Sequence, residues 1–411
     1  MLGSIARRNY FKGHYFDTQA TSKLEPRVLD AMLPFETFAH GNAHSGHGFG
    51  KEAEKAAETA RKQIADLINA NAKDIIFTSG ATESNNLAIK GSMAFLKSKG
   101  KKHLIVSQIE HKCVLESARY LERNGFDVTY LKVQKDGLVL PSDLEKAIRK
   151  DTGLVSILTV NNEIGVLQPI PKLANICKKH GVWMHTDAAQ AAGRIEINVK
   201  KSGVNLMSLS AHKMHGPKGI GALYMGNKPR VRIVPIINGG GQERGMRSGT
   251  LAVPLAVGFG KAAEIAQNEM KWDSPYIESL GKYLIEKVRA EIPEVIVNGS
   301  EESRWFGCVN ISFDCVEGES LMAKVPEYAV SSGSACTSAS LEPSYVLKAI
   351  GVGDENAHTS LRIGISKFTK KSEIDSFVSK LKTAVLYLRD LSPLWEMKQA
   401  GIDLSTVQWI D

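Results

Sequence analysis

The sequence has few cysteines and no long hydrophobic run, and both shortages exclude classes of protein. Its longest apolar stretches, such as residues 154–160, are far shorter than the roughly 18 to 20 residues that a membrane-spanning helix needs. The five cysteines form no C-x-x-C pair, so neither a disulfide framework nor a zinc ribbon fits the chain. Gly (36) and Pro (14) are near average in 411 residues, which excludes collagen-like and low-complexity architectures. We therefore expect a soluble globular protein in a reducing compartment.

The charge balance does not predict a nucleic-acid partner. Lys and Arg number 52 against 44 Asp and Glu, a formal net charge of +8, but no long basic run with interleaved aromatic residues forms a binding groove. The first residues carry Arg7, Arg8 and Lys12 without an acidic residue and interleave apolar side chains, as organelle-targeting presequences do. This leader predicts a mitochondrion or a mitochondrion-related organelle, with the cytoplasm as the alternative.

Short apolar runs alternate with longer helical patterns from about residue 50 to 225. This alternation is typical of an α/β protein with a parallel sheet covered by helices on both faces, whose ligands bind beyond the carboxyl ends of the strands. After about residue 270 the pattern changes to fewer, longer helices with interspersed strands. We expect a leader at 1–14, a large domain at 15–270, whose first residues can pack with the small domain, and a small α+β domain at 271–411. The predicted strands of the large domain are 75–78, 104–107, 154–160, 182–186, 206–210 and 221–225.

Three polar clusters follow predicted strands. Residues 78–83 form a small-residue turn before a helix, where exposed amides bind phosphate, although an ordinary helix cap looks the same. Asp187 ends a strand, where an acid either holds a protonated ring nitrogen or caps a helix. Lys213 follows the next strand, where an amine can form a Schiff base with an aldehyde cofactor, although most lysines are solvated surface charges.

This order of groups is what a pyridoxal phosphate enzyme needs. The cofactor is an electron sink, so its phosphate, its ring nitrogen and its aldehyde must each be held. Thr82, Asp187 and Lys213 are suited to these three tasks in that order. His111 is placed to stack on the ring or to relay a proton, and Asn162 to bond the phenolic oxygen of the ring or the substrate.

A fourth cluster, residues 331–340, consists of small residues around Cys336. No bulky side chain surrounds this cysteine, so we expect an exposed loop rather than a core position. A thiol on such a loop suits a nucleophile that attacks inside a site and then carries its product outside. The other four cysteines, at 113, 177, 308 and 315, lie in more apolar or helical contexts and are interpreted as structural.

Three further features leave alternatives open. Arg362 stands alone in an apolar segment, so we expect a carboxylate partner, either an internal salt bridge or a substrate. Three histidines are enough in number to bind a metal ion, namely His40, His44 and His47. The glycines around them, however, indicate a turn in which no helix or strand fixes the geometry of the ligands. The glycine-rich stretch 239–250 contains two arginines and either approaches a phosphate or forms a surface loop.

Five segments carry a likeness to a known family, and they are TSGATESN at 78–85, NNEIG at 161–165, SAHK at 210–213, RSGT at 247–250 and SSGSAC at 331–336. With these segments, from about residue 15 to 411, the chain resembles the housekeeping cysteine desulfurases of iron-sulfur cluster assembly. This resemblance implies a fold-type I, pyridoxal-phosphate-dependent transferase with a mainly parallel seven-stranded sheet. It also implies a cysteine desulfurase, which converts L-cysteine to L-alanine and leaves the sulfur as a persulfide on Cys336.

The resemblance assigns roles residue by residue. It implies that Lys213, Cys336 and His111 are catalytic, with Lys213 carrying the cofactor. Arg362 and Asn162 are similar to the residues that bind the substrate. The residues that the resemblance places around pyridoxal 5'-phosphate are Ala81, Thr82, Asn162, Asp187, Gln190, Ser210, His212, Lys213 and Thr250.

The resemblance also implies partners. Thr250 corresponds to a family residue that reaches the phosphate of the neighbouring subunit, which implies a homodimer with shared active sites. Sulfur would pass to an iron-sulfur scaffold protein and other acceptors, with tRNA thiolation among the uses, and a small accessory subunit is compatible with this role. No intrinsic metal site is implied, and the one metal contact is a 2Fe-2S cluster, shared with the scaffold, that Cys336 ligates transiently.

Two other functions compete with this one. An aminotransferase or a β-lyase on the same fold would not need Cys336. A catalytically silent binding subunit would not need Lys213. Because the chain has both residues, we favour the desulfurase.

Overall fold

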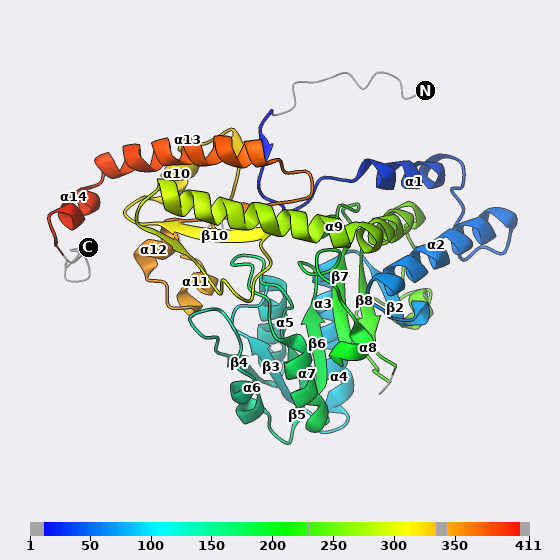
Figure 1. The fold of residues 1–411 in the computed structure, drawn as a ribbon. Coiled ribbons are helices and arrows are strands. Elements are labelled where there is room, and N and C mark those ends of the chain that lie inside the picture. Colours follow the sequence, from blue (N-terminus) through cyan, green and yellow to red (C-terminus); the bar gives the residue numbers. More distant parts are fainter. Residues whose placement is uncertain (1–11, 228–229, 334–342, 403–411) are drawn as a thin grey trace.

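The structure, a computed structural model, describes residues 12–227, 230–333 and 343–402. Its large sheet has seven strands in the order β2-β8-β7-β6-β5-β3-β4 (Figure 1). Neighbouring strands are parallel, except that β8 pairs antiparallel with both β2 and β7. The predicted α/β class and mainly parallel sheet are thus confirmed. The strands are β2 (Ile75–Thr78), β3 (His103–Ser107), β4 (Asp127–Leu131), β5 (Thr152–Ser156), β6 (Trp183–Asp187), β7 (Leu206–Ser210) and β8 (Gly221–Met225).

Helices cover both faces of this sheet, which explains its uninterrupted apolar strands. Leu104 and Ile105 are neighbours in β3, yet they belong to separate buried clusters because successive side chains point to opposite faces. The edge strand β4 buries only Leu131, so it has no apolar run and the sequence pattern did not identify it. The covering segments are α3 (Ala81–Asn86), η2 (Leu87–Gly91), α4 (Ser92–Lys97), α5 (Lys112–Arg123), α6 (Pro141–Ala147), α7 (Ile170–Lys179) and α8 (Val199–Ser202).

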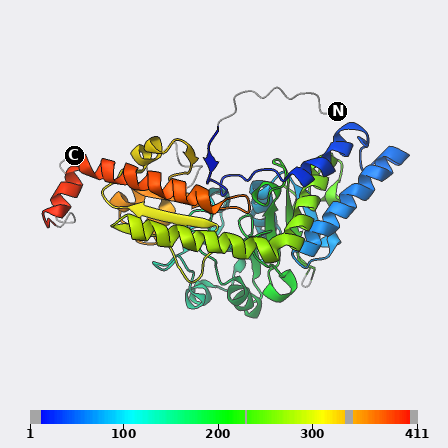
Figure 2. The same cartoon turned by 45° about the horizontal axis from the view of Figure 1, so that its top comes forward.

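A small antiparallel sheet of order β12-β10-β9 forms the C-terminal part of the molecule. Figure 2 shows its central strand β10 (Cys308–Phe313) between α9 (Val253–Glu291) and α13 (Lys371–Asp390). The helix α9 has 39 residues and extends from the large sheet to the small one (Figure 1). The other elements here are β9 (Val295–Val297), α10 (Gly318–Lys324), β11 (Tyr328–Ala329), α11 (Tyr345–Ala349), α12 (Asp354–His358), β12 (Ser360–Gly364) and α14 (Pro393–Gln399).

The N-terminal segment contacts both parts. The strand β1 (His14–Tyr15) pairs in parallel with β11, and α1 (Pro26–Thr37) and α2 (Gly48–Leu67) pack against α9. His47 caps α2 by accepting a hydrogen bond from the Gly50 amide, and the described residues contain no group of three or more His, Cys, Asp or Glu arranged to hold a metal. Within the described ranges, every helix is too short or too polar to cross a lipid bilayer. The remaining short helices are η1 (Ala72–Asp74), η3 (Ala211–Lys213) and η4 (Glu243–Gly245).

Candidate active site

A cavity of about 580 Å³ lies where the strands of the large sheet end. The segments that follow β2, β3, β5, β6 and β7 all contribute to its wall, as expected for the ligand site of an open α/β sheet. The structure therefore brings together side chains that lie far apart in the sequence. The candidate residues in the wall are Ala81, Thr82, His111, Asn162, Asp187, Gln190, Ser210, His212, Lys213 and Arg362.

Lys213 lies in η3, directly after β7. Its ammonium group Nζ donates hydrogen bonds to two backbone carbonyl oxygens of the N-terminal segment, that of Gln19 and that of Ala20, the latter at 2.8 Å. These neutral acceptors orient the amine into the cavity without forming an ion pair with it. Such an amine is available to an aldehyde once a ligand displaces those contacts.

Burial lowers the pKa of Lys213 to about 8. The positive charges of Arg194 and Arg362 lower the pKa further, while the carboxylates of Asp17 and Asp187 act in the opposite direction. A lysine with this pKa is uncharged in an appreciable fraction of molecules near neutral pH, and the uncharged amine is the nucleophile.

Asp187 is buried at the end of β6, and two donors hold its carboxylate in place. Its Oδ2 accepts a hydrogen bond from Asn85 Nδ2 at 2.6 Å, and its Oδ1 accepts one from the Ala189 amide at 2.9 Å. Gln190 is fixed in the same way, because its Nε2 donates to the Gln19 carbonyl at 3.0 Å. A fixed carboxylate in the cavity wall suits a protonated ring nitrogen.

The start of α3 forms a cradle for an anion. A Cβ atom placed on Gly221 would lie 2.6 Å from Gly80 Cα, and Gly80 has a φ of 154°, so side chains are excluded where these two segments meet. No side chain caps α3, and the Ser210 hydroxyl is buried without a hydrogen-bond partner among the described residues. Burial lowers the pKa of His212 to about 4, so its ring is neutral at pH 7. Free helix amides beside an unpartnered hydroxyl fit a phosphate group.

His111 caps the helix α5, with its Nδ1 accepting a hydrogen bond from the Cys113 amide at 3.2 Å. The thiol of Cys113 lies 3.0 Å from the same nitrogen and 3.2 Å from Asn85 Nδ2. Cys113 therefore belongs to the cavity wall, which its sequence context did not indicate. The three other described cysteines, Cys177, Cys308 and Cys315, are buried.

Arg362 in β12 reaches the cavity from the small antiparallel sheet. Its Nη2 forms an ion pair with Asp17 Oδ1 at 2.7 Å, and its Nη1 donates to the Asn162 carbonyl at 3.2 Å. The expected carboxylate partner is thus an internal one. The Nε atom is buried without a hydrogen-bond partner in the described chain, so one donor remains for an acidic ligand.

The glycine-rich stretch 239–250 is anchored to the sheet. Glu243 forms a bidentate ion pair with Arg61 on α2, with N–O distances of 2.7 and 2.8 Å. Arg247 forms another with Glu83 on α3, at 2.9 and 3.2 Å. Two ion pairs therefore hold this stretch beside the anion cradle, although most of its residues are exposed or partly exposed.

Among the candidate residues that the structure describes, Thr250 alone is not in the cavity wall. It is the last residue of the anchored stretch and is exposed to solvent. Cys336 lies outside the described residues. The roles assigned to them from the sequence stay predictions.

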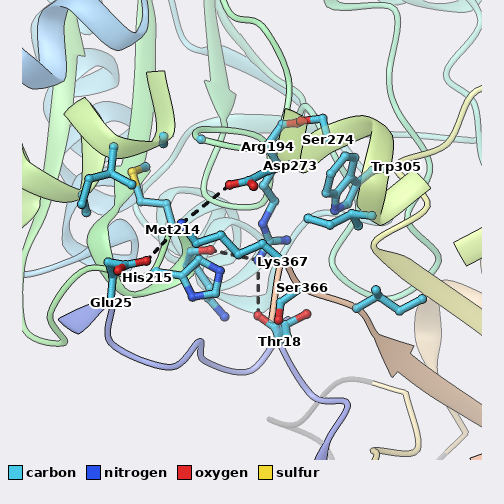
Figure 3. Close-up of a pocket in the computed structure, with 17 residues that line it drawn as sticks. Thr18, Glu25, Arg194, Met214, His215, Asp273, Ser274, Trp305, Ser366 and Lys367 are labelled. Carbon is cyan, nitrogen blue, oxygen red and sulfur yellow. Dashed lines mark hydrogen bonds and ion pairs between the residues drawn. The ribbon is translucent and has the colours of Figure 1, made fainter. Parts of the chain in front are cut away.

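A second, smaller cavity of about 40 Å³ has Lys213 among its lining residues, and Figure 3 shows several of the others. Lys367, which follows β12, enters its wall and forms ion pairs with Glu25 at 3.0 Å, Glu269 at 3.0 Å and Asp273 at 3.6 Å. Arg27 and Lys367 lower the pKa of Glu269 to about 2. This cluster joins the N-terminal segment, α9 and the segment after β12, in a cavity wall that includes Lys213.

Sequence reasoning missed several residues of the site. Asp17, Gln19 and Ala20 contact Arg362 or Lys213 from an N-terminal segment without a recognisable motif. Arg194 donates to the Lys213 carbonyl and to Gln190, and it follows Asp187 by only seven residues. The one signal in the sequence was that Arg194 follows the strand that ends at the candidate acid Asp187.

The fold and the lysine at the end of β7 define the class of protein. The chain matches the aminotransferase class-V family over residues 14–377, which is most of its length. The chain belongs to this family, and membership implies pyridoxal phosphate as the cofactor.

Individual relatives narrow the class. The chain is 56% identical over 397 residues to the mitochondrial cysteine desulfurase of Arthroderma benhamiae, covering 96% of this chain and 79% of that protein. It is 56% identical over 401 residues to the mitosomal cysteine desulfurase of Trachipleistophora hominis, covering 96% and 91%. A solved structure of a NifS-like protein has a TM-score of 0.85 at 36% identity, covering 91% of this chain and 100% of that one. Within the family the chain is a cysteine desulfurase, which confirms the resemblance stated above.

Proposed function

We propose that this cysteine desulfurase uses pyridoxal 5'-phosphate to convert L-cysteine to L-alanine and receives the sulfur as a persulfide on Cys336. The observation that carries the proposal is one cavity that combines a buried amine of lowered pKa, a fixed carboxylate and an unpartnered hydroxyl. These groups are Lys213, Asp187 and Ser210. They match the aldehyde, the ring nitrogen and the phosphate of the cofactor.

When bound, pyridoxal phosphate supplies a ring that accepts the electrons left at the substrate Cα. Asp187 would hold the ring nitrogen and Gln190 the ring oxygen, while His111 would stack on the ring. The amides of Ala81 and Thr82 begin α3 and suit the phosphate. Ser210 and His212 would complete the phosphate site, together with Thr250 of a second copy.

The chain's own residues then bind and orient the substrate and move its protons. The uncharged Lys213 amine takes the proton from the substrate Cα and returns it to the product. Arg362 Nε donates to the substrate carboxylate, and Asn162, in the segment that follows β5, supports this contact. His111 is placed to move a proton at the reacting sulfur.

The sulfur transfer balances without an added oxidant or reductant. The Cys336 thiolate attacks the substrate sulfur, an S–S bond forms, and the C–S bond breaks with its electrons going to the substrate Cβ. A proton on that carbon completes L-alanine. L-cysteine and the Cys336 thiol thus give L-alanine and a Cys336 persulfide.

We further propose a homodimer with shared active sites. Thr250 is exposed and lies outside the cavity of its own chain, as a residue that serves a neighbouring site would. Large apolar side chains are also exposed, among them Phe38 (81%) and Phe49 (56%). Such surface is typical of subunit contacts.

We place the protein in a mitochondrion or related organelle, because close relatives carry mitochondrial and mitosomal names. There it would supply sulfur to an iron-sulfur scaffold, with a 2Fe-2S cluster ligated transiently by Cys336, and to tRNA thiolation. An accessory subunit is compatible with this role. A fluorescent fusion of residues 1–20 tests the location, and a diffuse cytosolic signal would contradict it.

The central experiment measures alanine and persulfide formed from L-cysteine by the purified protein. Cys336→Ser should lose both products and keep the visible absorption of the cofactor, whereas Lys213→Ala should lose that absorption. Cys315→Ser, which changes a cysteine remote from the cavity, is the matched control. Wild-type alanine formation by Cys336→Ser would favour an aminotransferase or β-lyase. A protein that stays colourless with added pyridoxal phosphate would favour a binding subunit.

A further inference from the structure

Arg194 is a buried cation next to the candidate site. Its side chain is 9% exposed, and it forms no ion pair with any described residue. Buried arginines are ordinarily paired with a carboxylate, because an uncompensated charge away from water is costly. A buried arginine without an ion pair at this position therefore calls for a functional explanation.

The guanidinium of Arg194 joins three segments of the site. Its Nη1 donates to Gln190 Oε1 at 2.6 Å, and its Nη2 donates to the Lys213 carbonyl at 3.0 Å and the Thr18 carbonyl at 3.3 Å. Thr18 immediately precedes Gln19, whose carbonyl accepts from the Lys213 amine. The planar donors of one side chain therefore set the relative positions of these three segments.

Neighbouring residues hold Arg194 in turn. Ser274 on α9 donates its hydroxyl hydrogen to the Arg194 carbonyl at 2.6 Å. Figure 3 shows Arg194 beside Asp273 and Ser274 in the wall of the small cavity, which Lys213 also lines. Arg194 is thus buried in a wall that it shares with Lys213.

We propose that Arg194 is a positioning residue for the cofactor site, which fixes the Lys213 backbone and the Gln190 side chain and places an unpaired positive charge near the Lys213 amine. This inference rests on the proposed function, because the electrophile for that amine is the cofactor aldehyde.

The charges around Lys213 explain why Arg194 matters more than its neighbours. Arg362 is the other cation that lowers the pKa of Lys213, but its charge is largely neutralised by Asp17 at 2.7 Å. Asp187 raises the pKa of Lys213. Arg194 has no anionic partner among the described residues, so its charge acts on the amine without compensation.

Other groups on the elements around the amine contribute little. On the cavity side, burial lowers the pKa of His212 to about 4, so it is neutral at pH 7. Lys218 is exposed and screened by solvent, and Glu83 is paired with Arg247.

Behind the amine the charges are likewise compensated. Burial lowers the pKa of His215 to about 4, which leaves it neutral at pH 7. Lys367 is paired with Glu25 and Asp273, and burial raises the pKa of Asp273. Arg194 therefore differs from these groups, because it contacts Lys213 directly and has no anionic partner among the described residues.

The experiment measures how fast apoprotein binds pyridoxal phosphate at different pH values, followed by visible absorption. The uncharged amine reacts, so the rate of the wild type should rise with a midpoint near pH 8. Arg194→Met and Arg194→Gln remove the charge, so the midpoint should rise by roughly half to one pH unit, the effect of one nearby charge. At pH 7 loading should then be about three- to tenfold slower.

Arg194→Lys is the matched control, because it keeps the charge and loses the planar fork. Its midpoint should stay near that of the wild type, with a lower absolute rate. A slower rate with an unchanged midpoint in both neutral variants would show a structural role only and overturn the inference. So would a midpoint in Arg194→Lys that moves as far as in Arg194→Met.

Two results separate this inference from the proposed function. Wild-type protein that gains no visible absorption at any pH would refute the proposed function itself. If circular dichroism shows that neither neutral variant folds, the wild-type profile still decides. A wild-type midpoint near the ordinary lysine pKa of about 10.4 would overturn the inference.

Discussion

Replacing Glu243 by glutamine is expected to lower the free energy of unfolding by about 3 kcal/mol. The side chains of Glu243 and Arg61 are 6% and 7% exposed, and they form two N–O contacts of 2.7 and 2.8 Å. Glu243 Oε2 also accepts a hydrogen bond from the Phe77 amide at 2.8 Å. Breaking a buried pair of this kind costs about 3 to 5 kcal/mol because the remaining charge stays buried. Glutamine keeps one acceptor oxygen, which places the cost at the lower end.

The chain offers a matched control on the same arginine. Glu58 accepts from Arg61 Nε at 2.9 Å, but its side chain is 57% exposed. Glu58→Gln makes the same chemical change in water, where an ion pair contributes less than about 1 kcal/mol. The two variants therefore differ mainly in the burial of the carboxylate.

Urea unfolding followed by circular dichroism gives both values, from midpoints compared at an unchanged slope. Equal losses in the two variants, or a loss below about 1 kcal/mol for Glu243→Gln, would refute the reasoning. Arg61 would then be stabilised chiefly by the Ile75 carbonyl at 2.9 Å and by the Phe77 ring, whose centroid lies 4.6 Å from the guanidinium carbon.

Three further predictions follow from other contacts. Lys367→Met should destabilise the protein by about 3 kcal/mol in urea unfolding, because three carboxylates lose a largely buried cation. Arg362→Lys should raise the KM for L-cysteine about tenfold and leave the visible absorption of the cofactor unchanged, because lysine keeps the charge but not the planar set of donors. Burial lowers the pKa of His185 to about 3. In the unfolded chain His185 takes up a proton below about pH 6.5, whereas in the folded chain it does so only near pH 3. The free energy of unfolding therefore falls as the pH drops from about 6.5 towards 3, by about 2 kcal/mol at pH 5. His185→Asn should reduce that loss.

Each of these predictions has a control or an opposing result. Lys282→Met removes a lysine that is 51% exposed, and it should change the stability by less than about 0.5 kcal/mol. A normal KM with a shifted cofactor spectrum in Arg362→Lys would place Arg362 at the cofactor instead of the substrate. An acid dependence in His185→Asn as steep as in the wild type would show that other groups cause it.

Local sequence patterns predicted the fold class and most of the cavity wall. Buried strands appear as apolar runs, and the polar residues directly after them, such as Asp187 and Lys213, meet at one edge of the sheet. The strand β4 was missed because an edge strand with a solvated face has no apolar run.

Contacts between distant segments could not be predicted in this way. Asp17 pairs with Arg362 across 345 residues, and Lys213 contacts the Gln19 carbonyl across 194. Neither partner stands in a recognisable motif, and only the folded chain brings them together. The same holds for Cys113, whose place in the wall depends on how α5 begins at His111.

The 39-residue helix α9 constrains how the large sheet and the small sheet can move relative to one another. At 1.5 Å per residue it is about 58 Å long, so a rotation of a few degrees at one end displaces the other by several ångströms. Pro275 lies inside this helix and lacks the amide hydrogen for one backbone bond, which makes it the natural hinge. Bending there would change the separation between Arg362, in the small sheet, and Lys213, directly after a strand of the large sheet. Opening for substrate and closure for chemistry would then share a single hinge, next to the α9 residues that line the small cavity together with Lys213.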